Sequence, residues 1–226
     1  MDKMPVVTKN LLAINVLMFL GALVASKQGV DLNGILGLHF FMSSDFAPYQ
    51  FVTYMFMHGG IEHIFFNMFA LYMFGRAMEH VLGAKRFLIY YLVAGIGAGV
   101  LQEIVQYVYY ATTLSMYQSV DLGGGVIIPM SEYLGAFNTV GASGAIYAIL
   151  LGFGMTFPNE RMFIFPLPFP IKAKFFVIGY AVLEFALGVS GSNDGVAHFA
   201  HLGGMLFGLF LILYWRKKKK LGGPYV

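Results

Sequence analysis

Cysteine is absent from this chain, and charged side chains are scarce. Only 11% of its 226 residues are charged, whereas 58% are hydrophobic. Without cysteine there is no disulfide, no thiol nucleophile and no thiolate metal ligand. Soluble domains carry about 25% charged residues, so this chain has too little charge to cover a surface in water. Together with a mean hydropathy of +0.73, the composition predicts an all-α integral membrane protein.

Apolar segments suggest how many times the chain crosses the membrane. A spanning helix needs about 20 mainly apolar residues. We expect a single domain covering residues 1–226, with membrane-spanning helices at about 7–26, 61–81, 87–112, 140–157, 172–190 and 196–215. This is a six-helix bundle. Residues 1–26 have a basic start but only a weak cleavage-like end, so we interpret them as a retained first helix and not as a signal peptide.

Three connecting regions differ in character from the predicted spans. Residues 30–57 are apolar and aromatic but interrupted by glycine, serine, aspartate and proline. They predict a partly helical segment that lies in the membrane interface. Residues 115–133 are polar and rich in glycine, and residues 158–170 are interrupted by proline, so we expect both to be loops.

The basic residues predict the orientation of the helices. If the N-terminus is cytoplasmic, all of the 14 lysines and arginines except Lys27 fall on the cytoplasmic side. Cytoplasmic loops of membrane proteins carry such an excess. We therefore expect both termini in the cytoplasm and the protein in a prokaryotic inner membrane. The basic run Arg216–Lys220 favours contact with anionic lipid over nucleic acid.

Polar residues from three predicted spans lie at a similar depth near the external face. They are His63 and Asn67, spaced i, i+4 on one helix face, together with Ser143 and His201. Polar groups inside a membrane are costly and usually mark function. A serine activated by a histidine base is the minimum for nucleophilic acyl transfer. The amide of Asn67, the imidazole of His63 and the backbone N–H of Ser143 are candidate oxyanion donors.

Small residues beside this serine and histidine would let the helices approach closely. Gly144 follows the serine, and Gly204 and Gly208 follow the histidine at four-residue spacing. Alone, Gly141–Gly144 is more typical of helix packing than of catalysis, and with Ala145 it is not the Gly-x-Ser-x-Gly nucleophile elbow. A single intramembrane histidine also favours a packing role. Four polar residues from three spans at one depth, however, favour a catalytic site over helix packing.

The motifs resemble those of the rhomboid family of intramembrane serine proteases. They are His63–Asn67, Gly141–Gly144 and His201–Gly204 with Gly208, flanked by Tyr54–His58 and Gly75–Glu79, and the resemblance extends from about Leu11 to Tyr214. It implies an endopeptidase that cleaves transmembrane segments of single-pass or multi-pass membrane proteins near the external face. It implies no cofactor and no metal.

The resemblance also implies roles for individual residues. Ser143 would be the nucleophile and His201 the base, a dyad without a carboxylate. Asn67, His63 and Gly141 would belong to the oxyanion site. Tyr147 would pack against the ring of His201, with Gly144 supporting the helix contact. Residues 30–57 would form the membrane-embedded first loop, and residues 174–189 the substrate gate.

Some residues depart from the family pattern or have no clear role. Tyr49-Gln50 replaces a common Trp-Arg pair, which leaves Glu79 without that arginine. Glu184 would either bond a neighbouring hydroxyl or face water. Asp194 favours a solvated loop position over a third catalytic residue, and His198 would line the cavity without a catalytic role.

Other functions fit the sequence less well. A rhomboid-like pseudoprotease that binds membrane proteins would lack the serine or the histidine, and both are present. A transporter or channel often has polar sites at the midplane and internal repeats, whereas the polar residues here lie near one face and no repeat is visible. A metalloprotease could use four histidines, but the His-Glu-x-x-His signature is absent; they are His58, His63, His198 and His201. The natural substrate and the oligomeric state stay open.

Overall fold

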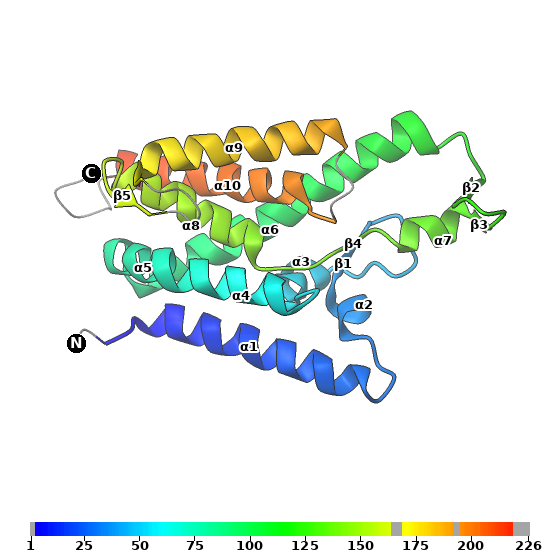
Figure 1. The fold of residues 1–226 in the computed structure, drawn as a ribbon, viewed down its shortest axis with the longest axis horizontal. Coiled ribbons are helices and arrows are strands. Elements are labelled where there is room, and N and C mark those ends of the chain that lie inside the picture. Colours follow the sequence, from blue (N-terminus) through cyan, green and yellow to red (C-terminus); the bar gives the residue numbers. More distant parts are fainter. Residues whose placement is uncertain (1–2, 164–168, 192–194, 219–226) are drawn as a thin grey trace.

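The protein is a bundle of helices whose long axes run roughly side by side (Figure 1). The computed structural model describes residues 3–163, 169–191 and 195–218. The helices are α1 Val6–Ser26, α2 Leu32–Leu36, α3 Gln50–Thr53, α4 Ile61–Ala70, α5 Arg76–Leu82, α6 Ala84–Tyr109, α7 Met130–Gly135, α8 Ser143–Thr156, α9 Ala173–Ser190 and α10 His198–Lys217. A 3₁₀ turn lies at Tyr54–Phe56 (η1), and π-helical turns lie at Leu71–Gly75 (η2) and Tyr110–Leu114 (η3).

Three short antiparallel strand pairs connect the loops. They are β1 Leu38–His39 with β4 Asn138–Thr139, β2 Ser119–Asp121 with β3 Ile127–Pro129, and β5 Arg161–Met162 with β6 Ile171–Lys172. The start of α1, the junction of α5 and α6 and the end of α10 lie at one end of the bundle, and the β2–β3 hairpin lies at the other (Figure 1).

Four of the described helical segments are long and apolar enough to cross a membrane. They are Val6–Ser26, Ala84–Leu114, Ala173–Ser190 and His198–Lys217. Helix α8 has only 14 residues, and the expected span at 61–81 is divided by the π turn η2 between α4 and α5. The predicted class, an all-α membrane bundle, is confirmed. The count of six spans stays a prediction.

Helices α6, α8 and α10 form the centre of the bundle. The contacts of α10 with α6 and α8 are the most extensive in the molecule, and aromatic residues such as Tyr90 and Tyr91 are fully buried there. In contrast, α9 exposes large apolar side chains, among them Phe175, Ile178 and Val182. An apolar outer surface of this extent suits a helix that faces lipid.

Glycines allow the central helices to touch backbone to backbone. A Cβ on Gly204 would lie 1.8 Å from the carbonyl oxygen of Gly144, and one on Gly208 would lie 2.8 Å from the Cβ of Ala148. A Cβ on Gly144 would in turn lie 2.5 Å from the Cβ of Ala98. The expected close packing through small residues is therefore present between α8 and α10, and α8 also touches α6.

The first loop is held together by a buried glutamine. Gln50 accepts hydrogen bonds from the backbone N–H groups of His39 and Ala47, at 3.3 and 3.0 Å. Its amide donates to the carbonyls of Ile35 and Asp45, at 3.2 and 2.9 Å. The residue that replaces the family arginine thus satisfies four backbone groups inside the loop.

Glu79, expected to lack an arginine partner, contacts backbone groups and a hydroxyl instead. Its carboxylate accepts hydrogen bonds from the backbone N–H groups of Val7 and Thr8 and from the Thr8 hydroxyl, at 2.9, 2.6 and 2.7 Å. The first N–H groups of a helix lack intrahelical acceptors, and a negative charge is favourable there. Glu79 therefore joins the end of the α4–α5 segment to the beginning of α1.

Two regions differ from their predictions. The polar segment 115–133 contains the β2–β3 hairpin and the start of α7, and its turn uses Gly123, Gly124 and Gly125 at positive φ. The helix expected from residue 140 begins only at Ser143, because residues 138–139 pair with β1 and Gly141 has φ +132. A residue at that φ cannot continue an α-helix.

Candidate active site

Ser143 is placed by the turn that precedes α8. The N–H of Gly141 donates to the carbonyl oxygen of Tyr54 at 2.9 Å, which ties this turn to η1. A Cβ at position 141 would meet the Nε2 atom of His63 at 2.7 Å, so both backbone angle and space require glycine. Ser143 is the first residue of α8, and its N–H therefore has no acceptor within the helix.

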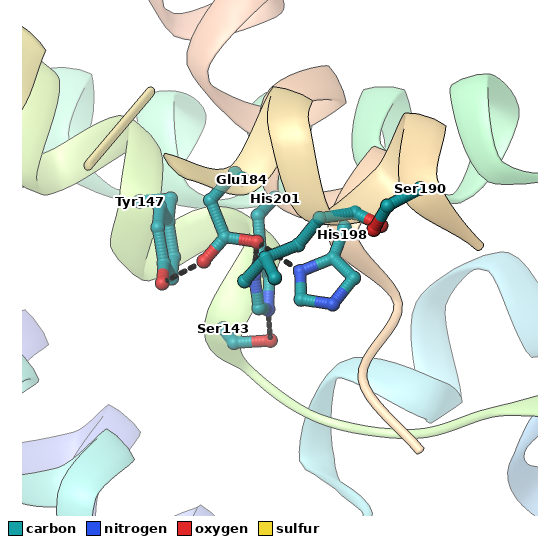
Figure 2. A network of polar contacts seen from close by, with 7 residues as sticks. Ser143, Tyr147, Glu184, Ser190, His198 and His201 are labelled. Atoms are coloured by element: carbon teal, nitrogen blue, oxygen red, sulfur yellow. Dashed lines mark hydrogen bonds and ion pairs between the residues drawn. The ribbon is translucent and has the colours of Figure 1, made fainter. Parts of the chain in front are cut away.

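The serine and the histidine predicted to act together are in hydrogen-bond contact. The Oγ atom of Ser143 lies 2.8 Å from the Nε2 atom of His201 on α10 (Figure 2). His201 is 7% exposed. An imidazole at this distance can take the hydroxyl proton, which makes the serine oxygen nucleophilic. The contact depends on the close approach of α8 and α10 at Gly144 and Gly204.

Tyr147 holds the imidazole from one side. It lies one turn after Ser143 on α8, and its ring stacks on that of His201 with centroids 4.1 Å apart and an interplanar angle of 8°. Stacking of this kind restricts rotation of the imidazole.

A cavity of about 610 Å³ brings the predicted polar residues together. Ser143, His201, His63 and Asn67 all line it, as does Gly141. The structure therefore gathers side chains from α4, α8 and α10 around one space. The remaining lining includes Phe66 and Glu62 of α4 and residues 195–197 before α10.

Two residues of α4 that line this cavity carry N–H donors. The Nδ2 atom of Asn67 is buried and has no hydrogen-bond partner within the described part of the chain. The Nδ1 atom of His63 accepts a hydrogen bond from the N–H of Gly59 at 3.3 Å. A neutral imidazole that accepts at Nδ1 carries its proton on Nε2, the atom beside Gly141. Both groups are therefore available to donate to a ligand atom near Ser143.

Glu184 of α9, whose role the sequence does not indicate, lies beside the Nδ1 atom of His201, on the side away from Ser143. Its carboxylate is buried, accepts a hydrogen bond from the hydroxyl of Tyr147, and lies 2.6 Å from Nδ1 of His198 and 3.0 Å from Nδ1 of His201 (Figure 2). The only sequence signal was a lone glutamate in an apolar helix. Of its two expected environments, the bond to a neighbouring hydroxyl is the one found.

Two other predictions concern residues near His201. His198 was expected to line the cavity, but it is not among the lining residues and instead contacts Glu184 behind it. Asp194, which was weighed as a third catalytic residue, lies outside the described residues.

The residues with metal-binding potential are Glu184, His198 and His201. Their ligand atoms lie within 4.8 Å of one another, and they form the one such group in the ranges that the structure describes. The 2.6 Å separation of His198 Nδ1 and Glu184 Oε2 is shorter than the distance of about 3.3 Å between two ligand atoms on a tetrahedral zinc ion. The arrangement therefore fits hydrogen-bonded imidazole and carboxylate groups better than a metal centre.

His58 and His63 form a separate pair, with ring centroids 5.0 Å apart. Burial, followed by the neighbouring His63, lowers the pKa of His58 to about 4. This loop histidine is therefore uncharged at neutral pH. Neither member of the pair belongs to the group around Glu184.

The sequence of the chain matches a family of known proteins. The family model described as Rhomboid domain matches residues 45–218. The chain is 30% identical over 175 residues to "Presenilin-associated rhomboid-like protein A, mitochondrial" of Danio rerio, covering 74% of this chain and 38% of that protein. It is 29% identical over 183 residues to "RHOMBOID-like protein 12, mitochondrial" of Arabidopsis thaliana, covering 80% and 50%.

A bacterial relative matches over a larger share of its own length. The chain is 28% identical over 174 residues to "Putative rhomboid protease YdcA" of Bacillus subtilis, covering 76% of this chain and 69% of that protein. The chain spans only about two fifths of the length of the presenilin-associated relatives that it matches. The family model covers most of the present sequence, and the protein is therefore a member of the rhomboid family.

Proposed function

We propose that this protein is an intramembrane serine endopeptidase that uses Ser143 as nucleophile and His201 as general base. The observation that carries the proposal is the 2.8 Å contact between Ser143 Oγ and His201 Nε2 at a cavity lined by polar groups. The two residues come from helices whose sequences are mainly apolar. Membership of a family with a relative named as a putative rhomboid protease supports the same activity.

The reaction would proceed in two steps, each with a balanced proton transfer. In the first, His201 takes the hydroxyl proton of Ser143 while Oγ bonds to the scissile carbonyl carbon. The tetrahedral intermediate collapses, the C–N bond breaks, and His201 gives the proton to the leaving amine. In the second, His201 takes a proton from water, the hydroxide attacks the acyl-enzyme, and Oγ leaves and regains the proton.

The oxyanion of each intermediate would be stabilised by donors that already face the cavity. Asn67 Nδ2, His63 Nε2–H and the N–H of Ser143 are the candidates, and the partly positive N-terminus of α8 adds to them. Gly141 leaves room for the His63 ring to approach. Donors fixed before the reaction need little reorganisation when charge develops.

The substrates would be transmembrane segments of other membrane proteins. The exposed apolar side chains of α9 and the exposed Phe66 of α4 suit the approach of an apolar helix from lipid toward the cavity. A helix must unwind before its carbonyl carbon can be attacked, so glycine or proline near the cleavage site should help. No cofactor is required by this mechanism.

The orientation and location belong to the proposal as well. All basic residues except Lys27 fall on one side of the predicted topology, and the start of α1 and the end of α10 lie at the same end of the bundle (Figure 1). Both observations support cytoplasmic termini with the site near the opposite face. We propose a prokaryotic inner membrane, although several relatives are named as mitochondrial.

Labelling with a fluorophosphonate–fluorophore probe tests the proposed chemistry. Detergent-purified wild type, Ser143→Ala and His201→Ala would be compared, with thermal unfolding to show that each is folded. We expect the wild type to be labelled covalently and both variants to remain unlabelled. A chelator should leave the labelling unchanged, because the nucleophile is a serine and not a metal-bound water.

Failure of folded wild type to label would contradict the proposal. Labelling of folded Ser143→Ala at the wild-type rate would contradict it as well, because another nucleophile would then be reacting. The first result would support the alternative of a rhomboid-like pseudoprotease that binds membrane proteins without cleaving them.

A further inference from the structure

Glu184 is a buried carboxylate on a helix that otherwise faces outward. Of the described α9 side chains, those that are buried belong to Ala173, Val177 and Glu184. Holding an ionisable group inside a membrane protein is costly unless its partners compensate. Among the described residues, Glu184 has three such partners, and all three belong to the helices that carry the predicted dyad.

The three contacts of Glu184 lie on the side of the His201 imidazole away from Ser143. Tyr147, which stacks on His201, donates its hydroxyl proton to Oε1 of Glu184. Oε2 lies 2.6 Å from Nδ1 of His198. The same Oε2 atom lies 3.0 Å from Nδ1 of His201. Figure 2 shows the carboxylate between the tyrosine and the two imidazoles, on the side of His201 away from Ser143.

The contact between Glu184 and His201 is electrostatic in this arrangement. The two atoms are at ion-pair distance, but His201 Nδ1 does not meet hydrogen-bond geometry. Nε2 of the same ring faces Ser143 Oγ. Once Nε2 takes the serine proton, the ring is an imidazolium, and a carboxylate 3.0 Å from its other nitrogen would stabilise that charge. A small ring rotation would turn the contact into a hydrogen bond.

We propose that Glu184 is a positioning residue for His201, so that the dyad works with a third, carboxylate member supplied by α9. The inference rests on the proposed function. Glu184 does not touch the substrate: it orients the imidazole through Nδ1 and through Tyr147, and its charge favours the imidazolium formed in both steps. His198 holds the carboxylate in place through its own Nδ1.

The arrangement also links the position of α9 to the base. In the second half of α9, Glu184 is the buried one of the described side chains, and its contacts help to join that half to α8 and α10. Displacement of α9 would withdraw the carboxylate from His201 and Tyr147 together. The proposed base would then be fully oriented only while α9 is packed.

The test compares Glu184→Gln and Glu184→Asp with wild type by the kinetics of fluorophosphonate labelling. Glutamine keeps the size and removes the charge, whereas aspartate keeps the charge on a shorter side chain. We expect kinact of Glu184→Gln to fall roughly 10- to 100-fold, less than the ~10⁴-fold loss when a well-aligned triad aspartate becomes asparagine. The probe's KI should change little, and Glu184→Asp should recover part of kinact.

Glu103→Gln is a matched control. Glu103 is buried to a similar degree on α6 and accepts a hydrogen bond from the N–H of Phe41 at 2.8 Å, away from the cavity lining. We expect this variant to keep the wild-type kinact. Thermal unfolding and the fraction of labelled protein, measured for every variant, separate a loss of folded protein from a slower chemical step.

Each outcome has a distinct meaning. If wild type labels and Glu184→Gln has kinact within twofold of it, the role of Glu184 is wrong while the proposed function stands. If the labelled fraction or thermal stability falls while kinact of the folded protein is unchanged, Glu184 is purely structural and the inference is again wrong. An equal loss in the Gln and Asp variants would also contradict a role for the charge. If wild type does not label, the proposed function itself fails.

Discussion

The candidate base is restrained by three different physical interactions. His201 stacks on Tyr147, faces Ser143 through Nε2 and faces Glu184 through Nδ1. Such restraint matters because an imidazole free to rotate would seldom point a lone pair at the serine proton. Across the cavity, the Nδ2 donor of Asn67 has no hydrogen-bond partner among the described residues. A buried unpaired donor is unfavourable unless a ligand or water satisfies it, which is the expected state of an oxyanion site before substrate binds.

Replacement of Asn67 by alanine tests the oxyanion site. We expect Asn67→Ala to lower the rate of substrate cleavage, or of fluorophosphonate labelling, by about 10²–10³-fold, as for loss of one oxyanion donor. Asn15→Ala is the control, since Asn15 is also buried but donates to the Leu11 carbonyl within α1. Equal rates for Asn67→Ala and Asn15→Ala would remove Asn67 from the site.

The hydroxyl of Tyr147 can be separated from its ring. Tyr147→Phe removes the donor to Glu184 and keeps the stacking on His201, so we expect only a modest fall in labelling rate, on the order of 2- to 10-fold for one lost hydrogen bond. Tyr147→Ala removes both interactions and should be slower by a further factor of about 10. If the two variants are equally slow, stacking does not contribute.

At the scale of secondary structure, the crossing of α8 and α10 determines the distance between serine and base. The crossing is close because glycines meet there: a Cβ at position 204 would lie 1.8 Å from the oxygen of Gly144. Backbone cannot yield as a flexible side chain does, so any larger residue must push the helices apart. A shift of about 1 Å would break a hydrogen bond of 2.8 Å between Ser143 and His201.

Gly204→Ala tests the importance of this crossing. We expect a loss of about 1–3 kcal/mol in stability from overpacking, together with a large loss of labelling in the fraction that still folds. Gly21→Ala on α1 is the matched control, because a Cβ there meets nothing within 4 Å. It should be neutral or stabilising by up to about 1 kcal/mol. Thermal unfolding and probe labelling measure both effects, and a Gly204→Ala protein that labels normally would contradict the packing argument.

At the scale of the whole molecule, the orientation of the protein in the membrane decides which compartment supplies water to the site. The first loop and the β2–β3 hairpin lie toward one end of the bundle, and the start of α1 and the end of α10 lie toward the other (Figure 1). The basic residues gather at the second end in the predicted topology. Water and substrate cleavage products would therefore be exchanged at the face away from the termini.

The absence of cysteine gives a direct test of this topology. Lys3→Cys, Lys27→Cys and Lys217→Cys would each be the only thiol in the protein. In intact spheroplasts of a bacterial host, we expect a membrane-impermeant maleimide to label only Lys27→Cys, because it alone faces outward in the proposed orientation. All three should label after permeabilisation. Labelling of Lys3→Cys in intact spheroplasts would show that the orientation is reversed.

Much of the architecture could be predicted from composition and periodicity. Long apolar runs require helices because a membrane interior offers no water to satisfy the backbone, so the all-α membrane class followed from the sequence. The beginning of α8 was misplaced by three residues, because a local pattern of apolar residues does not reveal that residues 138–139 pair with a distant strand. The four candidate spans of the described helices also leave the predicted six undecided.

Residue types and their spacing were sufficient to nominate Ser143, His201, His63 and Asn67, because polar groups are conspicuous in an apolar chain. The role proposed here for Glu184 could not be found in this way. It depends on which side of α9 faces the bundle and on how closely Tyr147, His198 and His201 approach one carboxylate. Hydropathy is a property of single residues and is readable along the chain, whereas contacts between atoms on three separate helices exist only after the helices have packed.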